Sequence, residues 1–301
     1  MTITHELLLE YLRKNGYHSP FQYNIHLFEL LNKFYESRPI VSAPRKYDSE
    51  SRLETAKVQM EQLAKIFPLS SPIQCLEFGC GGGDTAAFLA KNSRWDITAI
   101  DIKPRYDAWH EHGIYGNLRF INGDIEKYIV EYKNKFDLIY SFVVFEHVRN
   151  PQLILEALYS VLKDNGICFI KTNLYRSTIA SHLYRDIYFP YPHLLFENSV
   201  FDEYFAKRGN PGKRPTWVNK MSQFHYLDKF RSLGFKILDA VYSGRPYDEE
   251  FVNVFHEKLG KYPNDDLKID FMTCTLQKSR HNVCSTCTHG NQSFNFIELK
   301  L

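Results

Sequence analysis

Residues 74–87 read QCLEFGCGGGDTAA and contain the change of pattern on which the fold prediction depends. Apolar residues up to Phe78 predict a short buried strand, which four glycines interrupt, and helix-forming residues resume at 84–87 with Asp84 as the expected N-cap. Glycines let backbone N–H groups approach a ligand closely, and a helix N-terminus adds partial positive charge. The stretch therefore predicts a strand–turn–helix unit that binds a polar or anionic group.

Strand-like and helix-like segments alternate outward from this unit. Short apolar runs rich in β-branched and aromatic residues predict five strands, at 73–78, 96–101, 118–123, 136–144 and 166–174. Helical patterns lie between them, at 85–92, 106–112, 125–134 and 152–163. This alternation is typical of a parallel sheet with helices on both faces. A helix and two closing strands expected between residues 222 and 279 would complete seven strands.

The composition is that of an ordinary globular protein. Of the 301 residues, 44% are hydrophobic and 24% are charged, and a net charge of +2 gives no whole-surface argument for nucleic acid. We find no apolar run of the roughly 18 residues that a membrane span needs. The acid-containing N-terminus reads as an amphipathic helix rather than a signal peptide. We therefore expect a cytoplasmic protein with no membrane span and no nucleic-acid partner.

Glu77 separates this glycine turn from one that holds a pyrophosphate. The pattern Gly81-x-Gly83-x-x-Ala86 also fits a loose dinucleotide-binding motif, but an adjacent acid would repel a pyrophosphate. The run E-x-G-x-G-x-G from Glu77 to Gly83 instead resembles motif I of the class I S-adenosylmethionine-dependent methyltransferases. The ligand of that family carries a sulfonium and an ammonium, which an acid complements.

Three further features follow in the order found in that family. Asp101 ends the second expected strand, about 20 residues beyond the glycines. Gly123-Asp124-Ile125 ends the third, and Glu146-His147-Val148 follows the fourth. The run LKDNGICFIKTN at 162–173 also resembles a family motif. The resemblance covers residues 72–174 well and residues 221–279 by pattern, and it implies an α/β fold with a seven-stranded, mostly parallel, Rossmann-like sheet.

The resemblance implies S-adenosylmethionine as the cofactor and gives roles to several residues. Asp101 would accept the two ribose hydroxyls, because a carboxylate has two acceptor oxygens. Asp124 would take the adenine amino group, and Ile125 would cover the ring. The expected cofactor-binding residues are Glu77, Phe78, Gly79, Cys80, Gly81, Gly83, Asp101, Ile102, Asp124, Ile125 and Ser141.

His147 is the expected catalytic residue. Methyl transfer is an in-line displacement, and a hydroxyl acceptor also benefits from a base. His147 follows the fourth strand, at the carboxyl edge where ligands collect in open α/β sheets. Packing against the cofactor is the alternative role. His193 and His225 are further candidates, and Arg52 is a candidate partner for the cofactor carboxylate.

The expected organisation is a helical cap over 1–70, a methyltransferase domain over 71–279 with an insertion at 175–220, and a polar tail over 280–301. The insertion is aromatic and then basic, with Lys207, Arg208, Lys213 and Arg214. Aromatic rings suit stacking on a sugar or ring, and a basic rim suits a phosphate or carboxylate. We therefore expect a small-molecule acceptor with a hydroxyl or amine, of the sugar, glycan-precursor, phosphorylated or aromatic kind.

Two other functions remain open from the sequence. A catalytically inactive cofactor-binding or partner module would keep the same motifs, whereas an NAD-dependent oxidoreductase fits Glu77 and Glu146-His147 less well. No metal ligands are assigned. The tail pattern His281-x-x-Cys284-x-x-Cys287-x-His289 contains four possible ligands. Structural zinc sites usually take two ligand pairs from separated turns, so we expect an exposed tail without metal.

Overall fold

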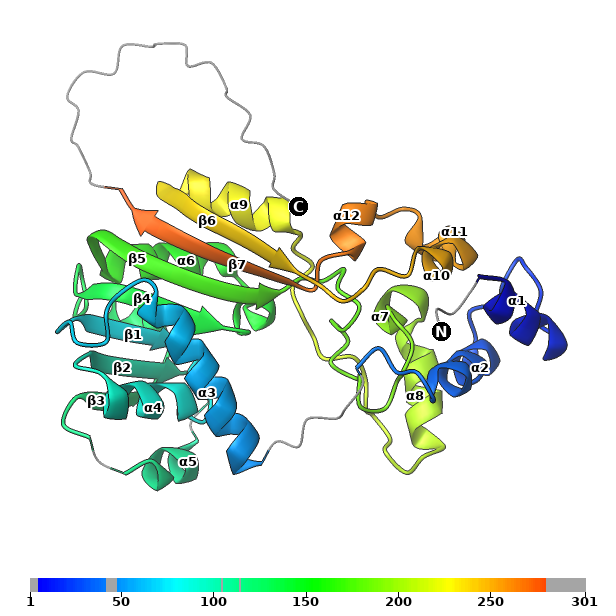
Figure 1. Ribbon diagram of the computed structural model, residues 1–301, viewed down its shortest axis with the longest axis horizontal. Coiled ribbons are helices and arrows are strands. Elements are labelled where there is room, and N and C mark those ends of the chain that lie inside the picture. Colours follow the sequence, from blue (N-terminus) through cyan, green and yellow to red (C-terminus); the bar gives the residue numbers. More distant parts are fainter. Residues whose placement is uncertain (1–4, 42–47, 104, 114, 280–301) are drawn as a thin grey trace, which may run out of the picture.

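The computed structural model describes residues 5–41, 48–103, 105–113 and 115–279. Seven strands form one sheet in the order β3-β2-β1-β4-β5-β7-β6, in which β7 runs antiparallel to both neighbours (Figure 1). The strands are β1 (Gln74–Phe78), β2 (Asp96–Asp101), β3 (Leu118–Asn122), β4 (Phe136–Phe142), β5 (Leu162–Asn173), β6 (Phe235–Ser243) and β7 (Phe271–Lys278). The predicted seven-stranded, mostly parallel α/β fold is confirmed.

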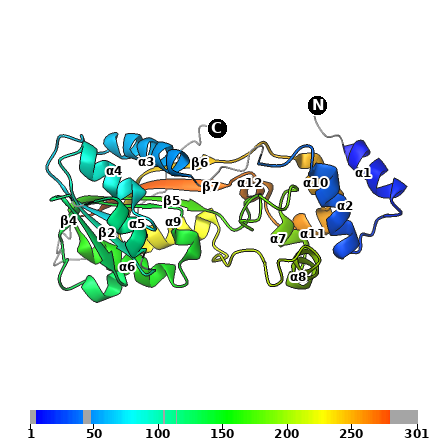
Figure 2. The ribbon, with the colours of Figure 1, turned by 90° about the horizontal axis from the view of Figure 1, so that it is seen from below.

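Helices cover both faces of the sheet. Figure 2 shows α3 (Ser49–Ala64) and α4 (Asp84–Asn92) on one side and α6 (Pro151–Val161) and α9 (Gln223–Ser232) on the other. Successive strand residues point to opposite faces. Leu138 accordingly belongs to the core beneath α3 and α4, and Ile139 to the core beneath α6 and α9. Burial of both faces explains the nearly continuous apolar runs in the sequence.

A second group of helices packs around its own core, beyond the ends of β5 and β7 (Figure 1). This helical lobe consists of α1 (His5–Lys14), α2 (Ile25–Tyr35), α7 (Pro192–Leu195), α8 (Asn198–Ala206), α10 (Glu249–Val254), α11 (His256–Leu259) and α12 (Asn264–Leu267). It combines three separate parts of the chain. Because these parts are far apart in the chain, no single stretch of sequence shows that they form one lobe.

The three N-terminal helices divide between the sheet and the helical lobe, whereas a single cap was expected over 1–70. Helix α3 packs against α4 on the sheet, whereas α2 packs against α8 in the helical lobe. Phe28 of α2 shows why. Its ring centroid lies 5.2 Å from that of Phe189, 5.4 Å from Phe201 and 4.6 Å from Tyr204, all in the insertion. An apolar stripe predicts a helix, but its packing partner lies about half the chain away.

Two local predictions differ from the structure. Residues 125–134 form only the short 3₁₀ helix η1 (Ile125–Tyr128) followed by turns, because β-branched residues such as Val130 weaken helix formation and Val130 is 91% exposed. Helix α4 has Gly83, with φ +85°, as its N-cap, and Asp84 is its first helical residue. Helix α5 (Tyr106–Glu111) and the 3₁₀ helix η2 (Phe145–His147) complete the elements. No helix within the described ranges is long and apolar enough to cross a membrane.

Candidate active site

The glycine turn after β1 has three glycines with positive φ, Gly79, Gly81 and Gly83. A Cβ at Gly79 would lie 2.5 Å from Val144, and one at Gly83 would lie 2.5 Å from Phe120. At Gly81 nothing lies within 4 Å of that position. Two of these glycines are therefore required by close packing, and Gly81 leaves open space beside the backbone for a ligand.

Helix α5 holds the turn from the side. Trp109 Nε1 donates a 2.9 Å hydrogen bond to the carbonyl of Gly81, and His112 Nε2 donates one of 2.9 Å to the carbonyl of Gly82. The Trp109 ring stacks on Phe120 with centroids 5.1 Å apart. Neither side chain was predicted from the sequence to contact the turn. Their i, i+3 spacing, which places them on one helix face, was the available signal.

Glu77 lies beneath the turn and is 6% exposed. Burial raises the pKa of its carboxyl group to about 8, and a 3.1 Å hydrogen bond from the Tyr140 hydroxyl opposes this shift only in part. Glu77 is therefore mostly protonated at neutral pH without ligand. A cationic ligand above the turn would favour the carboxylate, as expected for a sulfonium cofactor.

Asp101 lies at the end of β2 on the same side as the turn. Its two carboxylate oxygens accept hydrogen bonds of 2.8 Å from the backbone N–H groups of Gly81 and Lys103. Each oxygen keeps a second lone pair, and the residue is partly exposed. The next residue, Ile102, is 66% exposed and offers an apolar surface to a ring. Asp124, partly exposed after β3, completes a row along the ends of β1, β2 and β3.

Besides Glu77, four of the expected cofactor-binding residues have buried side chains. Ile125 is 1% exposed and packs in the sheet core, so its side chain does not present a face to an adenine ring. Ser141 donates a 2.9 Å hydrogen bond to the carbonyl of Phe78 and joins β4 to β1. Phe78 and Cys80 are also buried. These residues shape the strand ends, and Ile102, also an expected cofactor-binding residue, is the exposed apolar side chain beside Asp101.

Arg52 reaches the glycine turn from α3. Its Nε lies 3.5 Å from Asp84 Oδ1 at the start of α4. Nearby, the side chains of Gln59 and Thr85 are hydrogen-bonded between the same two helices. Arg52 thus lies where a cofactor carboxylate could recruit it, in an ion pair rather than on a solvated helix face.

Replacing Asp101 with Ala is expected to weaken S-adenosylmethionine binding about ten- to a hundredfold, since hydrogen bonds to a charged acceptor contribute roughly 1.5–3 kcal/mol. The change also releases the Gly81 N–H, which acts in the same direction. Isothermal titration measures the affinity, with the exposed Asp228→Ala of α9 as the control. Unchanged affinity in Asp101→Ala would show that this carboxylate does not contact the cofactor.

A cluster of Glu146, His147 and His182 lies at the carboxyl end of β4, and we refer to it as the β4-edge cluster. One potential ligand atom from each side chain lies within 4.8 Å of the other two. His147 is exposed, and its Nδ1 donates a 3.2 Å hydrogen bond to the carbonyl of Trp217. Glu146 is 1% exposed, and its Oε2 accepts a 3.0 Å hydrogen bond from Thr172. The cluster therefore joins η2, β5 and the insertion.

Burial shifts two members of this cluster towards their neutral forms. It raises the pKa of Glu146 to about 7. It lowers the pKa of His182 to about 4, and the neighbouring His147 adds to this effect. His182 was not predicted from the sequence, because no local pattern marks it and only the fold brings it to η2.

The other two candidate histidines have structural roles. His193 Nε2 donates a 2.7 Å hydrogen bond to the carbonyl of Tyr175, and burial lowers the pKa of His193 to about 4. His225 Nδ1 accepts a 3.1 Å hydrogen bond from the N–H of Ser222 and caps the start of α9. Neither belongs to the β4-edge cluster.

Most aromatic residues of the insertion, Trp217 excepted, form core rather than an acceptor pocket. Phe189, Phe201 and Phe205 are at most 2% exposed within the helical lobe. Each of the four expected basic residues forms an ion pair, namely Lys207 with Glu203, Arg208 with Glu29, Lys213 with Asp186 and Arg214 with Asp202. The expected basic rim is thus neutralised by neighbouring acids.

Trp217 is the exposed aromatic residue beside the β4-edge cluster. It is 54% exposed, and its carbonyl holds His147. The Arg149 guanidinium lies 5.8 Å from the centroid of its ring. Trp217 and Arg149 therefore offer an apolar face and a positive charge next to His147.

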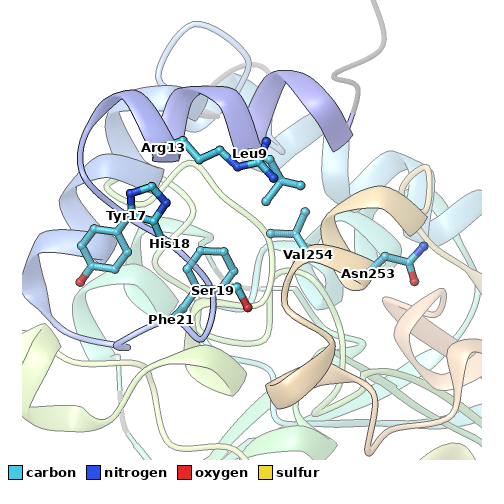
Figure 3. Close-up of a pocket in the computed structure, with 8 residues that line it drawn as sticks. All are labelled: Leu9, Arg13, Tyr17, His18, Ser19, Phe21, Asn253 and Val254. Atoms are coloured by element: carbon cyan, nitrogen blue, oxygen red, sulfur yellow. The ribbon is translucent and has the colours of Figure 1, made fainter.

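A pocket of about 400 Å³ lies in the helical lobe (Figure 3). Its lining residues are Leu9, Arg13, Tyr17, His18, Ser19, Phe21, Asn253 and Val254, from α1, the segment that follows it and α10. It shares no residue with the glycine turn or the β4-edge cluster. The tail residues His281, Cys284, Cys287 and His289 lie outside the described residues.

Residues 51–240, more than half of the chain, match the sequence profile of a family described as "Methyltransferase domain". The chain belongs to this family. The predicted membership of the class I S-adenosylmethionine-dependent methyltransferases is confirmed, and S-adenosylmethionine is the cofactor of this class. The residues fit it, with open space at Gly81, the Asp101 carboxylate on the same side and Ile102 exposed beside it.

Sequence relatives of this methyltransferase include proteins named ubiquinone biosynthesis O-methyltransferase. The one from Xylella fastidiosa (strain 9a5c) is 31% identical over 118 residues, which are 38% of this chain and 47% of the relative. The one from Rickettsia conorii is 30% identical over 162 residues, 50% of this chain and 54% of the relative. The chain thus spans about half the length of these curated relatives.

Solved structures show the same fold at low sequence identity. A putative S-adenosylmethionine-dependent methyltransferase from Listeria monocytogenes has a TM-score of 0.51 and 14% identity, with 75% of this chain and all of that chain covered. The [4+2]-cyclase SpnF has a TM-score of 0.50 and 17% identity, with 85% and 93% covered. Because one of these neighbours is a cyclase, the fold alone does not determine the reaction.

Proposed function

We propose that this protein transfers the methyl group of S-adenosylmethionine to a hydroxyl oxygen of a small molecule that binds at the β4-edge cluster. The position of the cluster supports this most directly. Strands β1 and β4 are parallel neighbours, so their carboxyl ends meet at one edge of the sheet. Val144, just before η2, packs so tightly on the glycine turn that a Cβ at Gly79 would collide with it.

The bound cofactor supplies a methyl group activated by a positively charged sulfur. The chain has to hold the acceptor oxygen in line with that methyl and exclude water. As the C–O bond forms, the C–S bond breaks with its electron pair going to sulfur, and the hydroxyl proton is lost. Glu146, His147 and His182 provide electron-pair donors at the place where this proton leaves, with His147 as the exposed member that contacts the acceptor.

Two observations support oxygen as the methylated atom and an aromatic acid as the class of acceptor. The curated relatives described above are named O-methyltransferases. Beside His147, the exposed Trp217 ring suits a planar apolar body, and the exposed Arg149 suits an anionic group. A sugar acceptor is less favoured, because most rings of the insertion, Trp217 excepted, are buried in the helical lobe.

The test is incubation of the full chain with methyl-labelled S-adenosylmethionine and matched acceptors. Pairs of benzoic acids that carry either a hydroxyl or an amino group at one position separate oxygen from nitrogen, and sugar phosphates form the third arm. We expect label on the hydroxybenzoic acids. Label on the amine alone would contradict transfer to oxygen.

A melting experiment distinguishes a catalytically inactive protein that still binds S-adenosylmethionine from a protein that binds a different cofactor. At a hundred times its dissociation constant, S-adenosylmethionine should stabilise the fold by about 2.7 kcal/mol, and NAD should have no effect. Stabilisation without transfer to any acceptor would favour a catalytically inactive cofactor-binding module.

A further inference from the structure

Two buried atoms of the β4-edge cluster have no hydrogen-bond partner, Glu146 Oε1 and His182 Nε2. An unpaired buried polar atom costs about 1–3 kcal/mol, and nearly all such atoms in native proteins are satisfied. These two belong to side chains that converge on the same point as His147. A common partner that accepts electron pairs from all three would remove both costs at once.

The distances within the cluster suit a metal ion as that partner. The three candidate ligand atoms lie within 4.8 Å of one another. Bonds of about 2.0–2.2 Å to one ion would place them roughly 3–3.5 Å apart. Closing the site therefore needs each pair of ligand atoms to approach by at most roughly 1–2 Å.

Outer hydrogen bonds already orient two of the ligands. Because the carbonyl of Trp217 can only accept, His147 Nδ1 carries the proton and its Nε2 lone pair stays available. Metal-binding histidines usually donate their other ring N–H in this way. Thr172 donates to Glu146 Oε2, which leaves Oε1, without a hydrogen-bond partner, available to an ion.

The backbone around the cluster is fixed by buried polar contacts. Asn219 Nδ2 donates to the carbonyl of Phe145 at 2.6 Å, and Asn219 N donates to that of Glu146 at 2.7 Å, so η2 is clamped from the insertion. His182 has φ +56°, a left-handed conformation that costs a non-glycine residue roughly 1–2 kcal/mol. Such strain persists where the surroundings enforce it, often at functional sites.

The turn that carries His182 is anchored on Asp270. This residue is 1% exposed and accepts hydrogen bonds from the Ser177 hydroxyl at 2.8 Å and from the Thr178 hydroxyl at 2.7 Å through Oδ1. Arg245 pairs with its Oδ2 at 2.7 Å. The His182 ligand is therefore presented by a fixed turn.

We propose that Glu146, His147 and His182 bind one divalent transition-metal ion, for which Zn²⁺ fits the donor set best. Two imidazole nitrogens and one carboxylate oxygen are the ligands of catalytic zinc sites, which keep a further position open. Mg²⁺ prefers oxygen ligands and fits poorly. In a role that rests on the proposed function, the open position takes the acceptor hydroxyl, which then loses its proton to solvent more readily.

The test measures metal binding without cofactor or acceptor. The full chain is prepared as Cys284→Ser/Cys287→Ser, which removes the thiols of the tail, and is stripped with a chelator. Titration with Zn²⁺, and with Co²⁺ as an absorbing substitute, should give one ion per chain. Glu146→Gln and His182→Gln should each raise the Zn²⁺ dissociation constant at least about a hundredfold, and His256→Gln, on exposed α11, should not change it.

A melting shift with S-adenosylmethionine shows which variants keep the fold. Because Glu146 and His182 are changed separately, the test remains possible if one of the two variants unfolds. Absence of Zn²⁺ binding in the stripped chain, or binding that survives both ligand changes, would overturn the proposed site. Methyl transfer that continues at full rate after stripping would refute the catalytic role of the metal while the proposed function stands. Stoichiometric Zn²⁺ without methyl transfer to any acceptor would support the site and contradict the proposed function.

Discussion

Replacing His147 with Ala is expected to lower the rate of methyl transfer by about 10²–10⁴-fold, the range for loss of a group that assists proton removal. Its affinity for S-adenosylmethionine should stay within about threefold. His147 is exposed at the β4-edge cluster, and its Nδ1 donates a hydrogen bond to the Trp217 carbonyl rather than to the glycine turn. Without a metal ion, loss of this residue removes the group that contacts the acceptor; with the proposed ion bound, it removes one of the three ligands of that ion.

Two measurements identify the role of His147. Transfer of labelled methyl to the acceptor gives turnover, and isothermal titration gives cofactor affinity, with His256→Ala as a matched control. Turnover within a few-fold of wild type would mean that positioning alone suffices. A large loss of cofactor affinity would instead identify His147 as a packing residue.

Replacing Glu77 with Gln is expected to stabilise the ligand-free protein above neutral pH and to weaken cofactor binding. Burial raises the pKa of this carboxyl group from 4.5 to about 8. The folded chain therefore holds this proton more tightly than the unfolded chain does. The resulting stability is complete below about pH 4.5 and is lost as the pH rises through about 8, by roughly 1.4 kcal/mol per pH unit, or on the order of 4–5 kcal/mol in all.

Glutamine at position 77 stays neutral and can still accept a hydrogen bond from the Tyr140 hydroxyl. The melting temperature of Glu77→Gln should therefore exceed that of wild type at pH 8 and match it near pH 4. Glu61→Gln, at an exposed position of α3, should show no such pH-dependent difference in melting temperature. Equal stability changes at both pH values would contradict the raised pKa.

The same substitution is expected to have an unfavourable effect on cofactor binding. A cationic ligand favours the Glu77 carboxylate, so wild type should release a proton on binding S-adenosylmethionine at pH 7. The binding enthalpy should then depend on the ionisation enthalpy of the buffer. Glu77→Gln should lose that dependence and bind about ten- to a hundredfold more weakly. A buffer-independent enthalpy in wild type would show that Glu77 does not ionise on binding.

The sequence alone predicted the features that short stretches encode. Alternating apolar runs predicted the strands of the sheet, because burial on both faces imposes that composition. The glycines between Glu77 and Asp84 predicted the turn, because Gly79 and Gly83 adopt positive φ at points of close packing. The order of the motifs along the chain was sufficient to identify the family.

Only the tertiary structure decided which distant segments meet. It brought His182 from the insertion to Glu146, buried the insertion aromatics around Phe28 of α2, and placed Trp109 on the glycine turn. It also shifted the pKa of Glu77, since desolvation depends on everything packed around a group. Period, turn and cap signals extend over a few residues, whereas burial and side-chain convergence arise from contacts between segments far apart in the chain.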